Sequence, residues 1–241
     1  MNYAPSITLQ GSYRIAQKQL FDTVTLNMPA GQWTCLLGRS GVGKSTILRL
    51  ILGLETAGKF AGMITTNDAK PIGGRASYMA QSDLLLPWLT LRENVVLGAR
   101  LRGEKPDLDK ADAMIERVGL TAHHAQKPGS LSGGMRQRAA LARALMEDRP
   151  IVLLDEPFSA LDAGTRADMQ DLAAEVLQGK TVLLVTHDPA EACRLGHHIS
   201  LLTPTGTEPW PLPETVPIRQ ADDPKTLQAQ AALLSHVRAT S

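Results

Sequence analysis

The sequence predicts an α/β protein with a mostly parallel sheet, an N-terminal antiparallel β part and an inserted helical subdomain. Continuous apolar runs at 151–154 and 181–185 are typical of parallel strands that are buried on both faces. Helical periodicity follows each run, and a longer helical pattern extends from residue 82 to about residue 145. This alternation favours an open parallel sheet whose ligands bind at the carboxyl ends of the strands.

Short strands are expected in the N-terminal third of the chain, where apolar and polar residues alternate or apolar residues form brief runs. These strands are 7–9, 24–28, 33–37 and 76–80. The first two suit an antiparallel pair, with Tyr13 in the connection between them. The Gly- and Thr-rich stretch 55–75 is interpreted as short strands and turns.

Helices account for most of the remaining chain. The clearest one has apolar residues along a single face. They are Leu108, Ala111, Ile115 and Val118. Asp188, with Pro189 at the first helical position and Glu191 at the third, predicts a second helix start. Prolines at 204, 209, 211, 213 and 217 indicate an irregular surface excursion, and residues 223–237 are predicted to form a terminal helix.

The most informative motif is the loop Gly38-Arg39-Ser40-Gly41-Val42-Gly43-Lys44-Ser45-Thr46, between a strand and a helix. Its glycines leave room for backbone N–H groups to converge on an anion, and the emerging helix adds its positive N-terminal end. Lys44 can then reach the outer phosphates of a nucleotide, and the Ser45 hydroxyl can ligate magnesium. The motif predicts a P-loop NTPase core, in which Tyr13 is either an exposed loop aromatic or a ring that stacks on adenine.

Polar residues at the ends of the two buried strands supply the groups that nucleotide hydrolysis needs. Asp155 is placed to hold magnesium directly or through water, and Glu156 is a candidate general base or water-orienting group. An acidic pair that only caps a strand is the alternative, and the four aliphatic residues before the pair argue against it. His187 is the histidine expected at a strand end, where it can bridge the γ-phosphate and the attacking water.

A second Gly-rich helix opening, Leu131-Ser132-Gly133-Gly134-Met135-Arg136-Gln137-Arg138, predicts another anion site. Two such openings far apart enclose one nucleotide only if the chain folds back on itself or if a second copy of the subunit contributes one of them.

These motifs, with Gln81, Asp162 and Thr186-His187-Asp188, occur in the order and spacing of ABC transporter ATP-binding subunits. The chain resembles this family over about residues 7–203. The resemblance implies four regions. They are a nucleotide-binding core with the first glycine loop and the antiparallel β part at 1–81, a helical subdomain with the signature motif at 82–145, a core segment with Asp155, Glu156 and His187 at 146–203, and a short tail at 204–241.

The resemblance also implies a head-to-tail dimer that closes over two ATP molecules with Mg²⁺. The residues that bind nucleotide would be Tyr13, Gly38, Arg39, Ser40, Gly41, Val42, Gly43, Lys44, Ser45, Thr46, Ser132, Gly133, Gly134 and Asp162. The metal ligands would be Ser45, Gln81 and Asp155. Glu156 would be the catalytic base and His187 the switch residue, with Lys44 and Gln81 completing the catalytic set. By the same likeness, Tyr13 becomes the adenine-stacking ring.

Residues 82–96 carry more apolar surface than a solvated loop should, and core packing of the helical subdomain is expected to take some of it. Pro87 and Trp88 resemble the groove that receives the coupling helix of a permease. The sequence Leu-Leu-Pro-Trp-Leu-Thr looks most like importers of nitrate, sulfonates, taurine and pyrimidine precursors of thiamine. The resemblance therefore implies integral-membrane permease subunits and, indirectly, a solute-binding protein. An ABC exporter ATPase and a soluble ABC ATPase not coupled to transport are the alternatives.

The composition of the chain limits which binding partners and which cellular compartment are expected. A net charge of +1 argues against a nucleic-acid partner and a polybasic membrane anchor. No stretch reaches the ~18 apolar residues of a membrane span, and no secretory leader is recognisable, so the protein is expected in the cytosol. The family resemblance then implies a peripheral subunit at the cytoplasmic face of the inner membrane. Cys35 and Cys193 are expected to be buried, reduced thiols.

Overall fold

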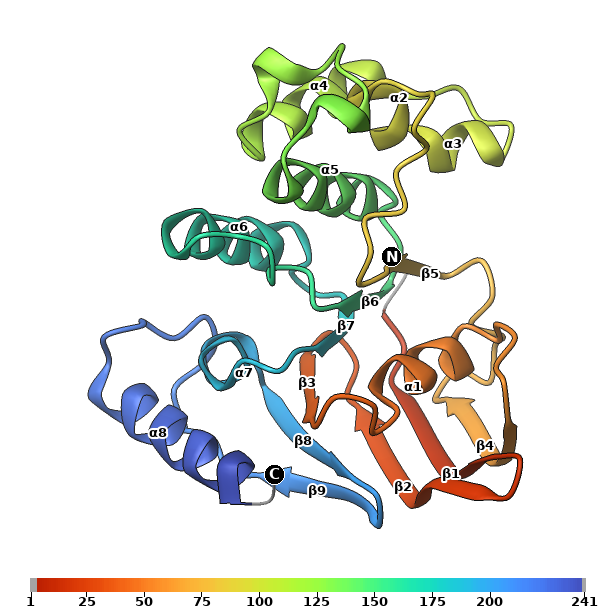
Figure 1. Ribbon diagram of the computed structural model, residues 1–241, viewed down its shortest axis with the longest axis vertical. Helices are drawn as coiled ribbons and strands as arrows, with labels where there is room; N and C mark the ends of the chain where they lie inside the picture. The colour runs from red at the N-terminus through yellow and green to blue at the C-terminus, as the bar shows by residue number, and fades with distance from the viewer. Residues whose placement is uncertain (1–3, 240–241) are drawn as a thin grey trace. The chain divides into compact units, whose positions relative to one another are not determined.

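The computed structural model describes residues 4–239 and divides into two compact units. The first unit contains the chain up to Ala76, the segment Pro150–Asp155 and the chain from Gln178 onward. The second contains Ser77–Arg149 and Glu156–Leu177. Figure 1 shows the elements of both, and each unit is described by itself.

The antiparallel part of the first unit consists of β1 (Ile7–Ile15), β2 (Lys18–Met28) and β4 (Lys59–Thr66). β1 pairs antiparallel with both β2 and β4, which confirms the predicted pairing of the first two strands. The observed strands are longer than the predicted ones, so Tyr13 lies inside β1 and the expected loop position is wrong. The stretch 55–75 contains one strand, β4, in place of several short ones.

The parallel part of the first unit holds β8 (His198–Thr203), β3 (Trp33–Gly38), β7 (Thr181–Val185) and β6 (Ile151–Asp155), side by side in that order. All residues of β6 and β7 are buried, as their continuous aliphatic runs predict. β9 (Gly206–Trp210) turns back antiparallel to β8 and also pairs with β2 at Thr23. The Pro-rich region therefore begins with a strand, where the sequence predicts an irregular excursion.

Three helices complete the first unit: α1 (Lys44–Ile51), α7 (Pro189–Leu195) and α8 (Pro224–Ala239). Gly53 follows α1 with φ +67°, a conformation that favours glycine just after a helix end. Asp188 caps α7 by accepting a hydrogen bond from Ala190 N at 2.8 Å. α8 packs against α7 (Figure 1), so the terminal helix is part of the unit. Cys35 and Cys193 are buried free thiols, as expected.

The second unit is helical apart from β5 (Ala76–Met79), which begins at its boundary. Its helices are α2 (Leu91–Val95), α3 (Leu97–Leu101), α4 (Leu108–Arg117), α5 (Gly133–Met146) and α6 (Ala163–Val176), with short 3₁₀ turns at Thr121–His123 and Pro128–Ser130. α5 is largely buried and packs against α2, α4 and α6. The predicted apolar face of α4 is buried except at Leu108, which lies at the exposed start of the helix. No helix within residues 4–239 is long and apolar enough to cross a membrane.

Candidate functional site

The strands of the first unit bring the predicted catalytic segments to one edge of the sheet. Val185 of β7 pairs with Leu36 of β3 on one side and with Asp155 of β6 on the other. These three residues form one row across parallel strands, with neighbouring strands about 4.8 Å apart. The loop that starts at Gly38, the carboxylate of Asp155 and the segment that begins at Thr186 therefore all leave the sheet at its carboxyl edge.

The glycine loop has the backbone conformation that its sequence predicts. Gly41 has φ +80° and Gly43 has φ +113°, both in the region that favours glycine. A Cβ added to Gly38 would lie 2.6 Å from the carbonyl oxygen of Leu202, so the loop needs the missing side chain there as well. The Lys44 ammonium is buried and donates hydrogen bonds to the carbonyl oxygens of Gly38 (2.7 Å) and Arg39 (3.1 Å). The loop is thus a preformed backbone cradle that carries a cation.

Asp155 and Ser45 are the candidate magnesium ligands of the first unit. Asp155 is buried at the end of β6, and Ser45 is the second residue of α1. A carboxylate and a hydroxyl are oxygen donors of the kind that Mg²⁺ prefers. The donor set of this unit therefore fits the expected metal.

His187 lies in a turn that is fixed on both sides. Thr186 Oγ1 donates a buried hydrogen bond of 2.7 Å to Glu191 Oε2 and accepts one of 3.0 Å from Asp188 N. Glu191 therefore binds the Thr186 hydroxyl, in addition to standing at the third position of α7. Sequence reasoning missed Thr186 as a positioning residue, although it directly precedes the histidine that the motif singles out.

Glu156 begins the second segment of the helical unit and has a constrained backbone conformation. Its φ is +50°, which is uncommon and costly for a residue with a side chain. Gln81 Nε2 donates a 3.3 Å hydrogen bond to Glu156 Oε2, and Gln137 Nε2 donates a 2.9 Å hydrogen bond to the Glu156 carbonyl oxygen. Gln137 is a positioning residue that sequence reasoning did not find, although the motif around Gly134 contains it.

The signature motif forms the start of α5 in the second unit. Ser132 is the N-cap, and its hydroxyl accepts a hydrogen bond from Met135 N at 3.2 Å. Gly133 and Gly134 form the first residues of the helix, which leaves their backbone N–H groups at its positive end. Asp162 caps α6 in the same way, and hydrogen bonds from Thr165 hold the pKa of its carboxyl below the usual range.

Tyr13 does not fit the role that the resemblance gave it. Only 1% of its surface is exposed, its ring stacks on Phe21 with centroids 5.7 Å apart, and its hydroxyl accepts a 2.6 Å hydrogen bond from Gly58 N. A ring that is covered in this way offers no face to a base. The expected adenine-stacking role of Tyr13 is therefore wrong, because Tyr13 is a core residue of the antiparallel sheet.

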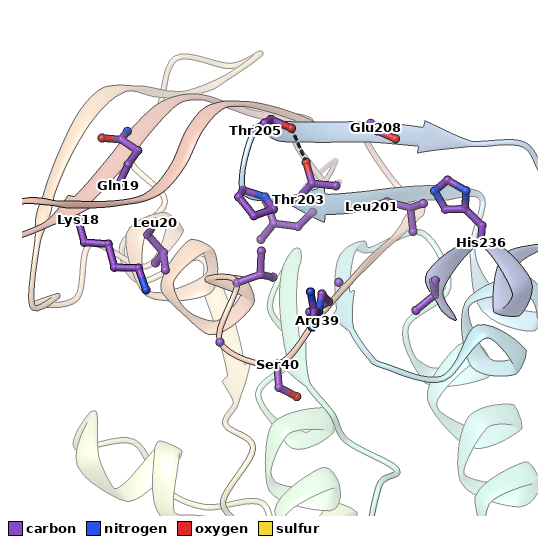
Figure 2. A pocket seen from close by; sticks show the side chains of 16 residues that line it. Lys18, Gln19, Leu20, Arg39, Ser40, Leu201, Thr203, Thr205, Glu208 and His236 are labelled. Atoms are coloured by element: carbon purple, nitrogen blue, oxygen red, sulfur yellow. Dashed lines mark hydrogen bonds between the residues drawn. The ribbon is translucent and has the colours of Figure 1, made fainter. Parts of the chain in front are cut away.

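A cavity of about 540 Å³ lies beside the glycine loop within the first unit (Figure 2). Residues 38–42 form one wall, 18–20 a second, and 201–205 with Glu208 a third. His236 and Val237 of α8 complete the lining. Nothing in the sequence pattern indicates that the terminal helix reaches this cavity, since His236 lies 194 residues after Val42.

A comparison with protein-family models decides the family. Residues 21–159, more than half of the chain, match the model described as ABC transporter. The chain belongs to the ABC transporter family. It is an ATP-binding subunit of that family and an ATPase.

Three relatives illustrate the similarity of this ABC transporter subunit to known proteins. An uncharacterized ABC transporter ATP-binding protein of Haemophilus influenzae is 48% identical over 185 residues, which is 76% of this chain and 75% of that one. The aliphatic sulfonates import ATP-binding protein SsuB 2 of Agrobacterium fabrum is 45% identical, covering 74% and 68%. The SsuB 1 protein of Rhodococcus jostii is 41% identical, covering 87% and 84%.

A solved structure supports the fold of the ABC transporter subunit. The post-hydrolysis dimeric state of the ATP-binding cassette MJ0796, bound to ADP and Pi, matches with a TM-score of 0.74 and 29% identity. The match covers 89% of this chain and 99% of that one. It confirms the predicted α/β fold with a mostly parallel sheet. The family match ends at residue 159, so Asp162, His187 and α8 lie beyond it.

Proposed function

We propose that this ABC ATPase drives uptake of a small sulfonate-type solute through separate permease subunits. The observation that carries the proposal is the similarity, at 38–45% identity, to several proteins named for aliphatic sulfonate import. Nitrate, taurine and pyrimidine-like solutes belong to the same predicted group of cargoes.

An exposed apolar surface on the second unit supports a permease partner. Leu84 and Trp88 are 60% and 65% exposed, in a loop that follows Gln81. The buried side chain of Asn94 holds this loop in place. Its Oδ1 accepts a hydrogen bond from Leu86 N at 2.7 Å, and its Nδ2 donates one to the Thr90 carbonyl oxygen at 3.0 Å. Large apolar side chains held in the open by a buried polar anchor are typical of a protein contact surface. Because Gln81 hydrogen-bonds to Glu156, a partner bound at this loop can affect the proposed base through Gln81.

The proposed chemistry is transfer of the γ-phosphoryl group of ATP to water. The backbone amides of 38–46 and the Lys44 ammonium bind the phosphates. Glu156 takes the proton of the attacking water while the bond between the γ-phosphorus and the oxygen of the ADP leaving group breaks. His187 donates a hydrogen bond to the γ-phosphate and orients the water. Ser45, Asp155 and Gln81 would hold Mg²⁺, which neutralises charge on the phosphoryl oxygens when it is bound.

We infer that two copies of the chain close head to tail over two ATP molecules. Ser132, Gly133 and Gly134 present a positive helix end, and Asp162 lies at the start of the next helix of the same unit. In the proposed dimer these residues meet the nucleotide held by the glycine loop of the other copy. The dimeric state of the matching ATP-binding cassette supports this arrangement.

The proposed dimer works as a peripheral subunit at the cytoplasmic face of the inner membrane, with a solute-binding protein as its indirect partner. An uptake assay tests the transport role. Cells that lack the gene should lose uptake of a labelled alkanesulfonate, and the wild-type gene should restore it.

Variant Trp88→Ser should fail to restore uptake and should not co-purify with membrane subunits, while the ATPase rate of the purified subunit stays unchanged. Variant Leu101→Ser, which alters another exposed apolar residue of the same unit, is the matched control and should restore uptake. Unchanged uptake in cells without the gene, or co-purification with ribosomes or DNA in place of a membrane protein, would overturn the proposal.

A further inference from the structure

Tyr13 is buried in the antiparallel sheet, so it offers no aromatic partner to the base of a nucleotide. The cavity beside the glycine loop offers one from another element. His236 of α8 is the residue with an aromatic ring among those that line it (Figure 2). Because the cavity shares residues 38–42 with the loop that binds the phosphates, a nucleotide on that loop can place its nucleoside part there.

Two contacts hold His236 in position. Its ring packs against the Trp210 side chain of β9, with centroids 4.7 Å apart and planes at 45°. Leu233, one turn earlier on α8, is fully buried and docks the helix in the first unit. The ring is therefore preorganised before a ligand arrives, which lowers the entropic cost of binding.

The remaining lining suits a purine nucleoside. Leu20, Val42 and Leu201 supply apolar surface for the faces of a base. Thr203, Thr205 and Glu208 supply polar groups for its edges and for a sugar. A carboxylate accepts hydrogen bonds, so Glu208 matches an amino edge such as that of adenine. A volume of about 540 Å³ lies within the range of small-ligand sites.

We propose that the base of bound ATP occupies this cavity and packs against His236, so that the C-terminal helix is part of the nucleotide site. His236 is then a base-contacting residue, and the ring contact with Trp210 holds it in position. The inference rests on ATP binding by this subunit and is independent of the solute proposed above.

Isothermal titration calorimetry of the full chain tests the proposal, with the non-hydrolysable ATP analogue AMP-PNP and inorganic tripolyphosphate as probes. Tripolyphosphate reports on the glycine loop alone. His236→Ala should raise the Kd for AMP-PNP about three- to tenfold, the range expected for one lost ring contact, and should leave the Kd for tripolyphosphate within about twofold. His236→Phe, which keeps a ring, should retain AMP-PNP affinity, and Trp210→Ala should weaken it.

Ser235→Ala changes the exposed neighbour of His236 on the same helix and serves as the matched control. Unchanged AMP-PNP affinity in His236→Ala, or an equal loss for AMP-PNP and tripolyphosphate, would overturn the proposal.

Photolabelling of the unaltered chain with 8-azido-ATP gives a second test that needs no variant. Label should appear in the peptide that contains His236 and be displaced by excess ATP. Label found only in peptides that do not line the cavity would contradict the assignment.

Discussion

The side chains of Gln81 and Glu156 are joined by a hydrogen bond of 3.3 Å from Gln81 Nε2 to Glu156 Oε2. Gln81 follows β5, and Glu156 follows β6, 75 residues later. Glu156 is also held through its backbone, by its left-handed φ and by the bond from Gln137. The proposed base is therefore oriented from three directions before any nucleotide binds.

Replacing Glu156 by glutamine should abolish turnover without abolishing nucleotide binding. The amide is similar in shape and cannot accept the proton of the attacking water, so phosphate release should fall at least about 100-fold. The variant should retain ATP and form a dimer in its presence, which light scattering would detect. Glu175→Gln, at an exposed acid of the same unit, is the control and should keep wild-type turnover. A Glu156→Gln protein that hydrolyses ATP at the normal rate would show that another group is the base.

Replacing Gln137 should slow catalysis through the position of Glu156. Its Nε2 donates to the Glu156 carbonyl oxygen and to Ser159 Oγ (3.1 Å), and its Oε1 accepts from Ala160 N at 2.7 Å. Gln137→Glu keeps the acceptor but loses both donors, so kcat should fall about tenfold while the KM for ATP stays within about twofold. Steady-state ATPase assays would measure both. An unchanged kcat, or a rise in KM alone, would argue against this positioning role.

Replacing Asn94 should loosen the exposed loop that we assign to the permease. Asn94 is fully buried and bonds to backbone groups of Leu86, Leu89 and Thr90. Asn94→Leu leaves these groups unsatisfied and should lower the free energy of unfolding by about 3 kcal/mol. Hydrogen exchange in residues 84–90 should accelerate more than in α5. Asn94→Asp, which retains the acceptor for Leu86 N, should give a smaller effect, and equal exchange in all three proteins would refute the anchor.

Replacing Arg219 should destabilise the first unit. Its guanidinium is buried and donates hydrogen bonds to the carbonyl oxygens of Cys193 and Gly196 (both 2.8 Å) and of Pro213 (3.1 Å). Burial lowers the pKa of this arginine. Arg219→Met fills similar space but leaves three carbonyl groups without a donor, so urea unfolding should report a loss of about 3 kcal/mol. Arg238→Met, on the exposed face of α8, should be nearly neutral.

The two thiols should resist modification in the folded protein. Burial raises the pKa of Cys193 to about 11 and raises the pKa of Cys35 further. Since the thiolate is the nucleophile, reaction with Ellman's reagent at pH 8 should be slow in buffer and complete in urea. Rapid reaction of either thiol under native conditions would mean that its burial is transient.

The sequence predicts the parts of the fold that depend on local pattern. Continuous aliphatic runs correctly place β6 and β7, because strands buried on both faces tolerate few polar residues. Glycine spacing correctly predicts the backbone of the loop, since Gly41 and Gly43 both have a positive φ that favours glycine. Polar residues directly after those strands also lie where expected, because the carboxyl ends of parallel strands share one edge.

Features that depend on distant contacts were not predictable. Tyr13 is polar enough for a loop, yet stacking on Phe21 and the bond from Gly58 place it in the core. β9 contains a proline and has little strand propensity of its own, and its pairing with β8 outweighs that preference. No local signal links His236 to the loop near residue 40, because β8, β9 and α8 must all fold before the helix reaches the cavity.

The connection of β9 to β2 has a consequence for biosynthesis. Thr25 N donates a hydrogen bond to Thr207 Oγ1 across 182 residues of sequence. β2 is therefore synthesised long before β9, the strand that it pairs with. While the nascent chain elongates, the helical unit can acquire its contacts first, and the open flank of β2 stays exposed to wrong pairing. The pairing of β2 with β9 can therefore form only after synthesis has passed residue 207.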